Sequence, residues 1–216
     1  MFSYNITYIY GLDGSGKSTV CQALFKELAK RETQAIYRWM RFNHYSSKLI
    51  NAIGRLVGLS YYVTYPDGTR IGYHRYDKSP LLGLFYSLSI IMDTFMATLF
   101  KIWIPNIFRH KLIVVDRFVF DKIVDLSIDT RDPKLMLKWP GRLLKRLLPR
   151  KSFSIHLRVD NDKIFERRPD VRWDENYFVR ATLYEEICKI YGENRKVDNN
   201  GELKDTLDAI MKQLSK

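Results

Sequence analysis

A short glycine-rich segment constrains the fold of this chain more than any other feature. Residues 11–18 read GLDGSGKS and match the pattern G-x-x-x-x-G-K-[ST]. The segment follows the β-rich run ITYIY, which ends at Tyr10, and it precedes residues 17–31, whose apolar positions have helical spacing. Glycines allow backbone N–H groups to point into one concavity, and the N-terminus of the next helix adds partial positive charge. The sequence therefore predicts a phosphate-binding loop between a strand and a helix.

The chemistry of this loop indicates ATP as the ligand, with Mg²⁺ as the cofactor. Lys17 is expected to reach the β- and γ-phosphates, and the hydroxyl of Ser18 is expected to bind the metal ion. The alternative is an ordinary glycine turn capped by Ser18. The expected ATP-binding residues are Gly11, Asp13, Gly14, Ser15, Gly16, Lys17, Ser18 and Thr19.

A second motif follows an aliphatic run, as is usual for a site of this kind. Residues 112–116 read LIVVD, which predicts a central parallel strand that ends in Asp116. A carboxylate at the end of such a strand holds Mg²⁺ directly or through water. Arg117 follows at once. Alternatively, Asp116 only caps the next helix and Arg117 pairs with a surface acid.

The order of signals along the chain predicts a single α/β domain covering residues 1–216. Strands and helices alternate, which indicates about five parallel strands flanked by helices in a three-layer P-loop fold. Residues 59–79 are rich in Tyr, Gly and polar groups, with a turn signal at Pro66-Asp67-Gly68, and they predict a loop or small insertion. Strands are expected at 7–10, 34–40, 112–115, 153–159 and near 196–197, and helices at 17–31, 45–56, 81–105, 119–126, 134–147, 176–190 and from 202.

The charge of the chain favours an anionic partner. The net charge is +12, from 36 Lys and Arg against 24 Asp and Glu. A nucleotide, a nucleic acid or a membrane surface would each satisfy this balance. Basic stretches at 134–151 and 158–172 hold much of the excess, and the first has the Leu spacing of a solvated helix. We expect no stable nucleic-acid partner.

The cysteines and the N-terminus favour a cytoplasmic location. Cys21 and Cys188 form no pair with the spacing of a metal site or a disulfide framework. The N-terminal run MFSYNITYIYG lacks the basic and apolar regions of a secretion signal.

The segment 81–105 is apolar enough to suggest a membrane span. Asp93 lies in its middle, however, where a carboxylate in lipid would cost a few kcal/mol. A helix buried in the core or in a subunit interface is therefore expected. We accordingly expect the chain to form a homodimer and not to bind a membrane.

In these two motifs the chain resembles the thymidylate kinases. Their phosphate loop commonly reads G-x-D-G-x-G-K-S-T and their third strand ends in Asp-Arg-Tyr or Asp-Arg-His, which residues 11–19 (GLDGSGKST) and 116–118 (DRF) resemble. The C-terminal third also resembles that family's lid and the helix after it. The residues that carry this part are Arg167, Arg168, Arg172, Asp174, Glu175, Phe178, Arg180 and Tyr184.

The resemblance implies roles for particular residues. Asp13 would face the sugar of the acceptor, and Arg117 its phosphate. Arg38 or Arg41 would also hold that phosphate, although either could be a plain surface residue. An acceptor phosphate must be neutralised before another phosphoryl group approaches it, and Arg offers a planar, permanently charged fork.

A lid at about 161–176 would supply the charge needed for transfer. Position 14 is Gly, whereas some members of the family carry an Arg inside the phosphate loop. Catalytic contacts are therefore expected from Arg167, Arg168 and Arg172, together with Lys17 and Asp116, unless the lid arginines are a solvated turn.

The acceptor base is where the chain departs from the family. The position that usually carries an Arg for thymine is Phe95, and no Arg or Lys occurs between Leu81 and Phe100. Phe95 or Phe85 could stack on a base, or each could belong to the core.

The expected function is transfer of the γ-phosphate of ATP to a (deoxy)nucleoside monophosphate, with dTMP implied by the resemblance. Two alternatives remain open. The acceptor could be another nucleotide, a nucleoside or a metabolite, or the chain could be a nucleotide-binding protein without kinase activity.

Overall fold

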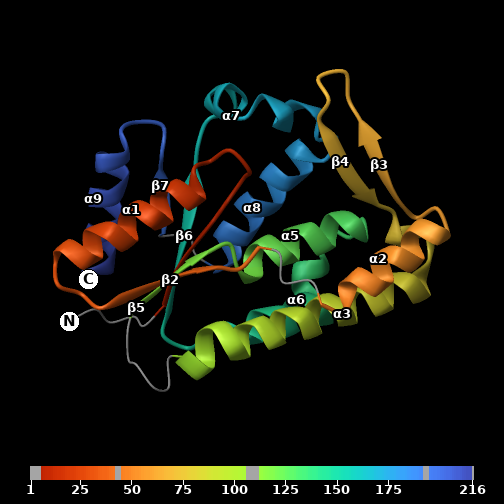
Figure 1. Ribbon diagram of the computed structural model, residues 1–216, viewed down its shortest axis with the longest axis horizontal. Coiled ribbons are helices and arrows are strands. Elements are labelled where there is room, and N and C mark those ends of the chain that lie inside the picture. The colour runs from red at the N-terminus through yellow and green to blue at the C-terminus, as the bar shows by residue number, and fades with distance from the viewer. Residues whose placement is uncertain (1–5, 42–44, 106–111, 192–194, 216) are drawn as a thin grey trace.

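A parallel five-stranded sheet forms the centre of the fold (Figure 1). The computed structural model describes residues 6–41, 45–105, 112–191 and 195–215. The strand order is β2-β5-β1-β6-β7, and each neighbouring pair runs parallel. This confirms the predicted α/β class and its five parallel strands. The strands are β1 (Ile6–Tyr10), β2 (Ala35–Trp39), β5 (Leu112–Asp116), β6 (Ser152–Arg158) and β7 (Lys196–Asp198).

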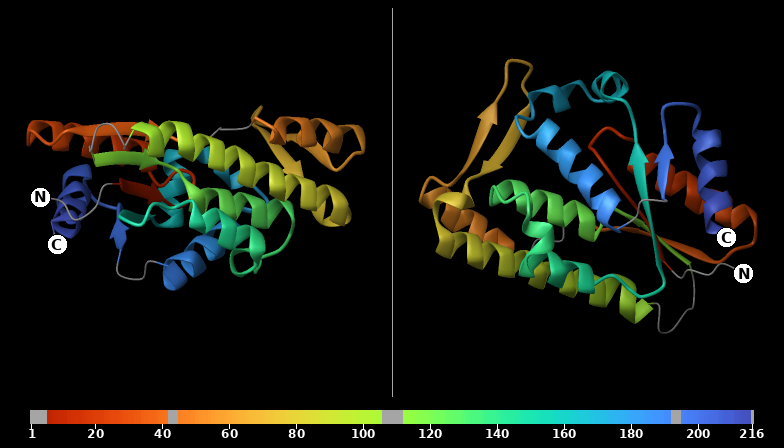
Figure 2. Two further views of the ribbon diagram at one scale, coloured as in Figure 1. Left: turned by 90° about the horizontal axis from the view of Figure 1, so that it is seen from below. Right: turned by 180° about the vertical axis from the view of Figure 1, so that it is seen from behind.

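Helices cover both faces of this sheet, which gives three layers (Figures 1 and 2). On one face lie α1 (Lys17–Lys30) and α9 (Leu203–Leu214). On the other lie α3 (Pro80–Thr98), α5 (Val119–Asp129), α6 (Trp139–Arg146) and α8 (Tyr177–Tyr191). Strand β1 contributes side chains to both faces of the sheet. Ile9 packs against the layer of α1 and α9, and Tyr8 and Tyr10 pack in the core on the opposite face.

The register of the sheet brings the two predicted motifs together. Ile9, two residues before the phosphate loop, pairs with Asp116 at the end of β5. Parallel strands place their carboxyl ends at one edge of a sheet, and ligands bind there where the strand order reverses. The phosphate loop and Asp116 therefore share one edge.

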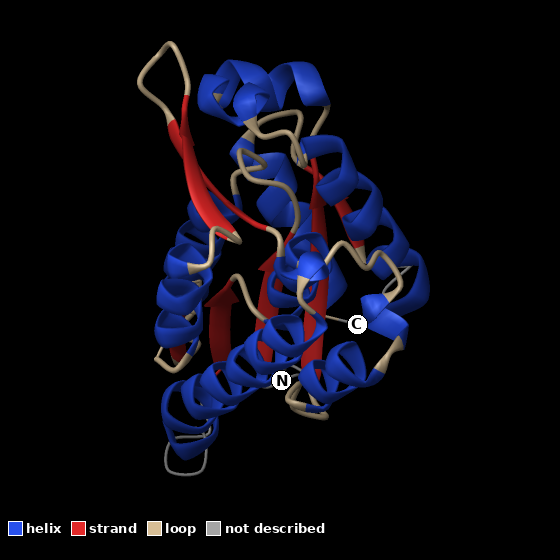
Figure 3. Cartoon of the chain, turned by 90° about the vertical axis from the view of Figure 1, so that its right-hand side faces the viewer, coloured by secondary structure: helices blue, strands red, loops and turns tan. Residues whose placement is uncertain are grey.

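The Tyr-rich insertion is a β-hairpin that stands apart from the sheet. Strand β3 (Ser60–Thr64) pairs antiparallel with β4 (Arg70–His74), and the Asp67 side chain accepts a hydrogen bond from the Thr69 N–H at 2.9 Å in the turn. This agrees with the predicted turn at 66–68. The hairpin follows α2 (Ser47–Leu56) and projects past the sheet beside the helices of the lid (Figure 3).

The lid consists of α7 (Asn161–Arg167) and a 3₁₀ turn, η4 (Pro169–Trp173). It lies above the carboxyl edge of the sheet, opposite α3 in Figure 1. Both elements fall within the segment 161–176, where the lid is expected.

Helix α3 buries small and polar residues together with Tyr86 and Ile90, and it exposes large apolar residues. Within the described residues, Pro80–Trp103 is the one helix long and apolar enough to span a membrane, and 50% of its most apolar window is buried in the fold. The carboxylate of Asp93 is buried and accepts from Ser46 and Ser47 at the start of α2. The inner face is thus committed to the fold. The exposed outer residues of α3 are Leu81, Leu84, Phe85, Leu88, Met92 and Phe95, and Phe100 is exposed in the turn that follows the helix.

Candidate active site

The predicted phosphate loop, residues 11–18, has a backbone that favours glycine at three positions. Gly11, Gly14 and Gly16 have φ angles of 144°, 87° and 87°. A Cβ on Gly11 would stand 2.6 Å from the carbonyl oxygen of Leu157, and one on Gly16 would stand 2.8 Å from the amide nitrogen of Asn199. The loop is therefore packed closely between β6 and the segment after β7.

Lys17 is held by the loop itself. Its side chain is buried, and Nζ donates to the carbonyl oxygens of Gly11 at 2.5 Å and Leu12 at 2.7 Å. Burial lowers the pKa of Lys17, and the carboxylate of Asp13, 3.5 Å from Nζ, opposes that shift. Phosphate oxygens are stronger partners for an ammonium group than carbonyl oxygens are, so a bound phosphate would replace these contacts.

A carboxylate ringed by cations joins the loop to the residues after β5. Asp13 accepts from Arg117 at 2.6 Å and from Arg41 at 2.9 Å. Burial would raise the pKa of Asp13, but Lys17, Arg117 and Arg41 outweigh it and hold that pKa well below its usual range. Three cations around one anion leave net positive charge, which an entering phosphate would neutralise.

Arg117 is held in a conformation that non-glycine residues seldom adopt. Its φ is 60°, and its Nε is buried without a partner in the described part of the chain. Such backbone strain persists where the surrounding structure fixes it, and it is common at functional sites. Here it turns the guanidinium toward Asp13.

The residues expected to hold Mg²⁺ fit that role. Asp116 is fully buried; one carboxylate oxygen accepts from the Tyr37 hydroxyl at 3.0 Å, and the other has no partner among the described residues. An orphaned carboxylate oxygen beside a phosphate loop suits Mg²⁺ or a water ligand of it. Ser18 is half-buried in the first turn of α1, at the same edge.

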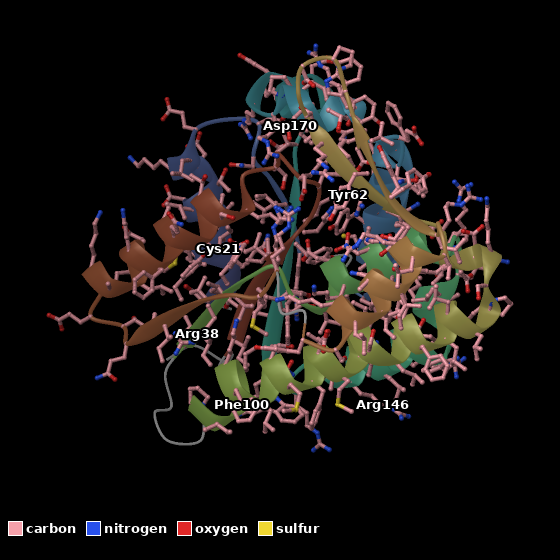
Figure 4. The ribbon with its side chains drawn as sticks, turned by 45° about the vertical axis from the view of Figure 1, so that its right-hand side comes forward. Cys21, Arg38, Tyr62, Phe100, Arg146 and Asp170 are labelled. Carbon is pink, nitrogen blue, oxygen red and sulfur yellow. The ribbon has the colours of Figure 1, made fainter. Side chains whose placement is uncertain are left out.

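A cleft of about 550 Å³ opens from this cluster. Helix α5 and α3 form its floor, the lid and α8 form its roof, and the hairpin closes the far end (Figure 4). Basic side chains of the lining are Arg41, Arg70, Arg117, Lys122, Arg168 and Arg180.

The three lid arginines have different surroundings. Arg167 donates to the backbone of Asn199 at 3.0 Å and lies beside Gly16. Arg168 lines the cleft, where it pairs with Asp170 at 2.6 and 2.8 Å. Arg172 instead lies over the ring of Phe165, at 5.4 Å, and outside the cleft lining. Arg168 is thus the lid arginine that lines the cleft, and Arg167 is the one that lies beside the predicted phosphate loop.

Two other expected acceptor residues lie away from the cleft. The guanidinium of Arg38 donates to the backbone oxygens of Lys101 and Tyr37, each at 3.4 Å. Arg38 lies inside β2 and its guanidinium reaches the backbone after α3, whereas Arg41 follows the end of the strand and reaches Asp13. Phe95 lies on the outer face of α3 and contacts Trp103 edge-on at 6.0 Å. Neither residue is retained as an acceptor ligand.

Several lining residues were not singled out from the sequence. Asp121, Asp125 and Asp129 recur every four residues and line the cleft from α5. That spacing was readable in the sequence VFDKIVDLSID. Arg180, by contrast, is one of the residues that the sequence singles out by the family resemblance; it donates to Asp125 at 2.5 Å and to Asp174 at 3.0 Å and so ties α8 to both the floor and the lid.

Asp129 is expected to destabilise the fold as the pH rises. It is buried, accepts from the Tyr86 hydroxyl at 2.8 Å, and has a pKa raised to about 7 by burial and by the charge of Asp125. Unfolded carboxyls ionise near pH ~4, so stability is lost as the pH rises from there through about 7. Asp129→Asn should therefore raise Tm by about 3–8 °C at pH 8, and by much less at pH 5. Equal shifts at both pH values in melts followed by circular dichroism would contradict this.

A scan against models of protein families and a search of curated proteins gave no match to this chain.

Proposed function

We propose that this chain is an ATP-dependent phosphotransferase of the nucleoside monophosphate kinase type. One observation carries the proposal: Lys17 of the phosphate loop and Arg117 and Arg41 of the cleft converge on the single carboxylate of Asp13. Two anion-binding sites therefore adjoin, one for the phosphates of ATP and one for a phosphorylated acceptor. A protein that only binds ATP has no need of the second site.

The arrangement suits direct transfer between two phosphates. Arg41 and Arg117 would neutralise the acceptor phosphate, and Lys17 would hold the β- and γ-phosphates of ATP. A phosphate oxyanion is already a nucleophile, so positioning and charge neutralisation carry the rate without a separate general base. Mg²⁺ held through Asp116 and Ser18 would supply further charge at the β- and γ-oxygens.

The test is a kinase screen with the common ribo- and deoxynucleoside monophosphates, read as ADP formed. We expect ATP-dependent phosphorylation of at least one acceptor, with dTMP the acceptor implied by the family resemblance. Tight ATP binding without transfer to any acceptor would instead favour the nucleotide-binding alternative. Salt-dependent binding of nucleic acid by the same protein would strengthen that outcome.

The chain is also proposed to be a cytoplasmic homodimer joined through α3. Its outer face is apolar over its whole length, and the one charged residue between Pro80 and Phe100, Asp93, points inward. Two copies could therefore meet there without opposing charges. A lone monomer would leave this face in water, which soluble monomers rarely do.

Sedimentation velocity at ~10 μM is expected to show a dimer. Phe85→Glu should shift it to monomer, because a carboxylate would be buried without a partner in the interface. Leu203→Glu on α9, across the sheet, is the matched control and should remain dimeric. A wild-type protein that sediments only as a monomer contradicts the proposal, and flotation with lipid vesicles would assign the face to a membrane.

A further inference from the structure

The hairpin and the lid are joined over the cleft. Trp173 of the lid donates from Nε1 to the Asp67 carboxylate at 2.7 Å and stacks on Tyr65 at 5.1 Å between ring centroids. The Tyr73 hydroxyl accepts from the N–H of Glu175 and donates to the backbone oxygen of Trp173, both at 3.2 Å. The hairpin is therefore a fixed wall of the cleft in this closed arrangement.

One face of the hairpin presents a ring and a cation to the cleft. Tyr62 and Gly72 are paired across the strands, and a Cβ on Gly72 would stand 3.1 Å from the ring of Tyr62. The guanidinium of Arg70 lies 4.2 Å from the centroid of the same ring. Both side chains line the cleft, and Figure 4 shows Tyr62 on its inner side.

Two polar groups at this end have an open hydrogen-bonding position within the described part of the chain. The buried Nδ1 of His74 makes no hydrogen bond, and Asp129 uses one oxygen for Tyr86 and leaves the other unbonded. Buried or half-buried polar groups are normally satisfied, so a cluster of open ones indicates a ligand.

The distance along the cleft matches a nucleoside monophosphate. Asp121 lies at the level of the Asp13 cluster, where it accepts from Tyr184 at 2.9 Å, and Asp129 lies eight residues further along α5. Eight helical residues rise about 12 Å. A phosphate held by Arg117 would therefore place its base between Tyr62 and Asp129.

We infer that this far end is the base pocket and that it selects nucleotides whose base carries an exocyclic amino group: cytosine, adenine or guanine. Tyr62 stacks on the base, Asp129 accepts from its amino group, and Arg70 donates to a neighbouring carbonyl or ring nitrogen. Thymine and uracil have no exocyclic amino group. The single N–H on their pairing edge lies between two carbonyl oxygens, and these oxygens would repel the carboxylate of Asp129. The inference rests on the proposed function, and it names the acceptor class of the same site.

The test measures binding as well as transfer. Calorimetric Kd values for monophosphates, taken with a non-hydrolysable ATP analogue present, should favour at least one amino-bearing nucleotide over dTMP and UMP by on the order of 10-fold or more. Asp129→Asn, which replaces an acceptor by an amide able to donate, should shrink this ratio to near one. The Kd of the ATP analogue should stay unchanged.

A pair of variants on one strand separates stacking from a general effect on the hairpin. Tyr62→Ala should raise the Kd of the preferred monophosphate by on the order of 10-fold, because base stacking is lost. Tyr62→Phe should retain binding. Tyr61→Ala is the control, since Tyr61 lies on the opposite face and contacts Tyr73. Equal losses from Tyr62→Ala and Tyr61→Ala would overturn the role of Tyr62.

The outcomes separate the two proposals. Selective binding of amino-bearing nucleotides without transfer supports the base pocket and contradicts the kinase. Transfer with dTMP as the tightest-binding acceptor supports the kinase and overturns the base pocket. A ratio of Kd values that Asp129→Asn leaves unchanged also overturns the base pocket. Failure of every monophosphate to bind overturns both.

Discussion

Replacing Lys17 with alanine should lower kcat for phosphoryl transfer by on the order of 10³-fold or more. The change deletes the one cation that the phosphate loop itself provides, since position 14 is Gly. The fold should survive, because among the described residues the polar contacts of Nζ are with the loop carbonyls and Asp13. Steady-state rates with the best acceptor, with Tm as the check on folding, measure the effect.

The control for this variant is Lys26→Ala, further along α1. Lys26 is exposed and far from the loop along the helix, so its loss should leave kcat within about threefold. Near-normal turnover by the Lys17→Ala protein would show that the loop does not hold the transferred phosphate. A large fall in its Tm would instead assign Lys17 a structural role.

Replacing Arg168 with alanine should lower kcat by on the order of 10²-fold, with little change in KM for ATP. Arg168 lines the cleft beside the Asp13 cluster, and its Cβ is 3.4 Å from the place where a side chain on Gly14 would stand. Charge that develops during transfer would be met there. Arg168→Lys should restore little, because lysine lacks the planar fork.

The lid supplies its own control. Arg172→Ala removes a cation of the same element that lies over Phe165 and not in the cleft, so kcat should change by less than about fivefold. Arg167→Ala tests the other lid arginine proposed to stabilise the transition state, which lies beside Gly16. If all three alanine variants keep wild-type kcat, the lid does not stabilise the transition state, and Arg117 or Arg180 must do so.

The fold was predictable wherever local chemistry decides the backbone. The glycines at 11, 14 and 16 predict a loop with positive φ, and the aliphatic run 112–115 predicts a strand buried on both faces. Pro66-Asp67-Gly68 predicts the tip of the hairpin. Each of these signals lies within a few residues of the element that it determines.

The cleft was only partly predictable, because its walls come from distant parts of the chain. Asp67 and Trp173 are in contact although they lie 106 residues apart. The choice of Arg41 over Arg38 depends on where β2 ends, and the outward direction of Phe95 depends on which face of α3 packs inward. Periodicity gives neither property, since α3 has apolar residues on both its buried and its exposed face.

The joint between hairpin and lid has a consequence for the timing of turnover. Because Trp173, Asp67 and Tyr73 close the cleft from two independent elements, neither element can swing away alone without breaking the same bonds. For the proposed kinase, entry of the acceptor and escape of its product would therefore require these bonds to break together. Such a joint would prolong the residence time of a bound nucleotide, and the stacking of Trp173 on Tyr65 makes its fluorescence a reporter of each opening.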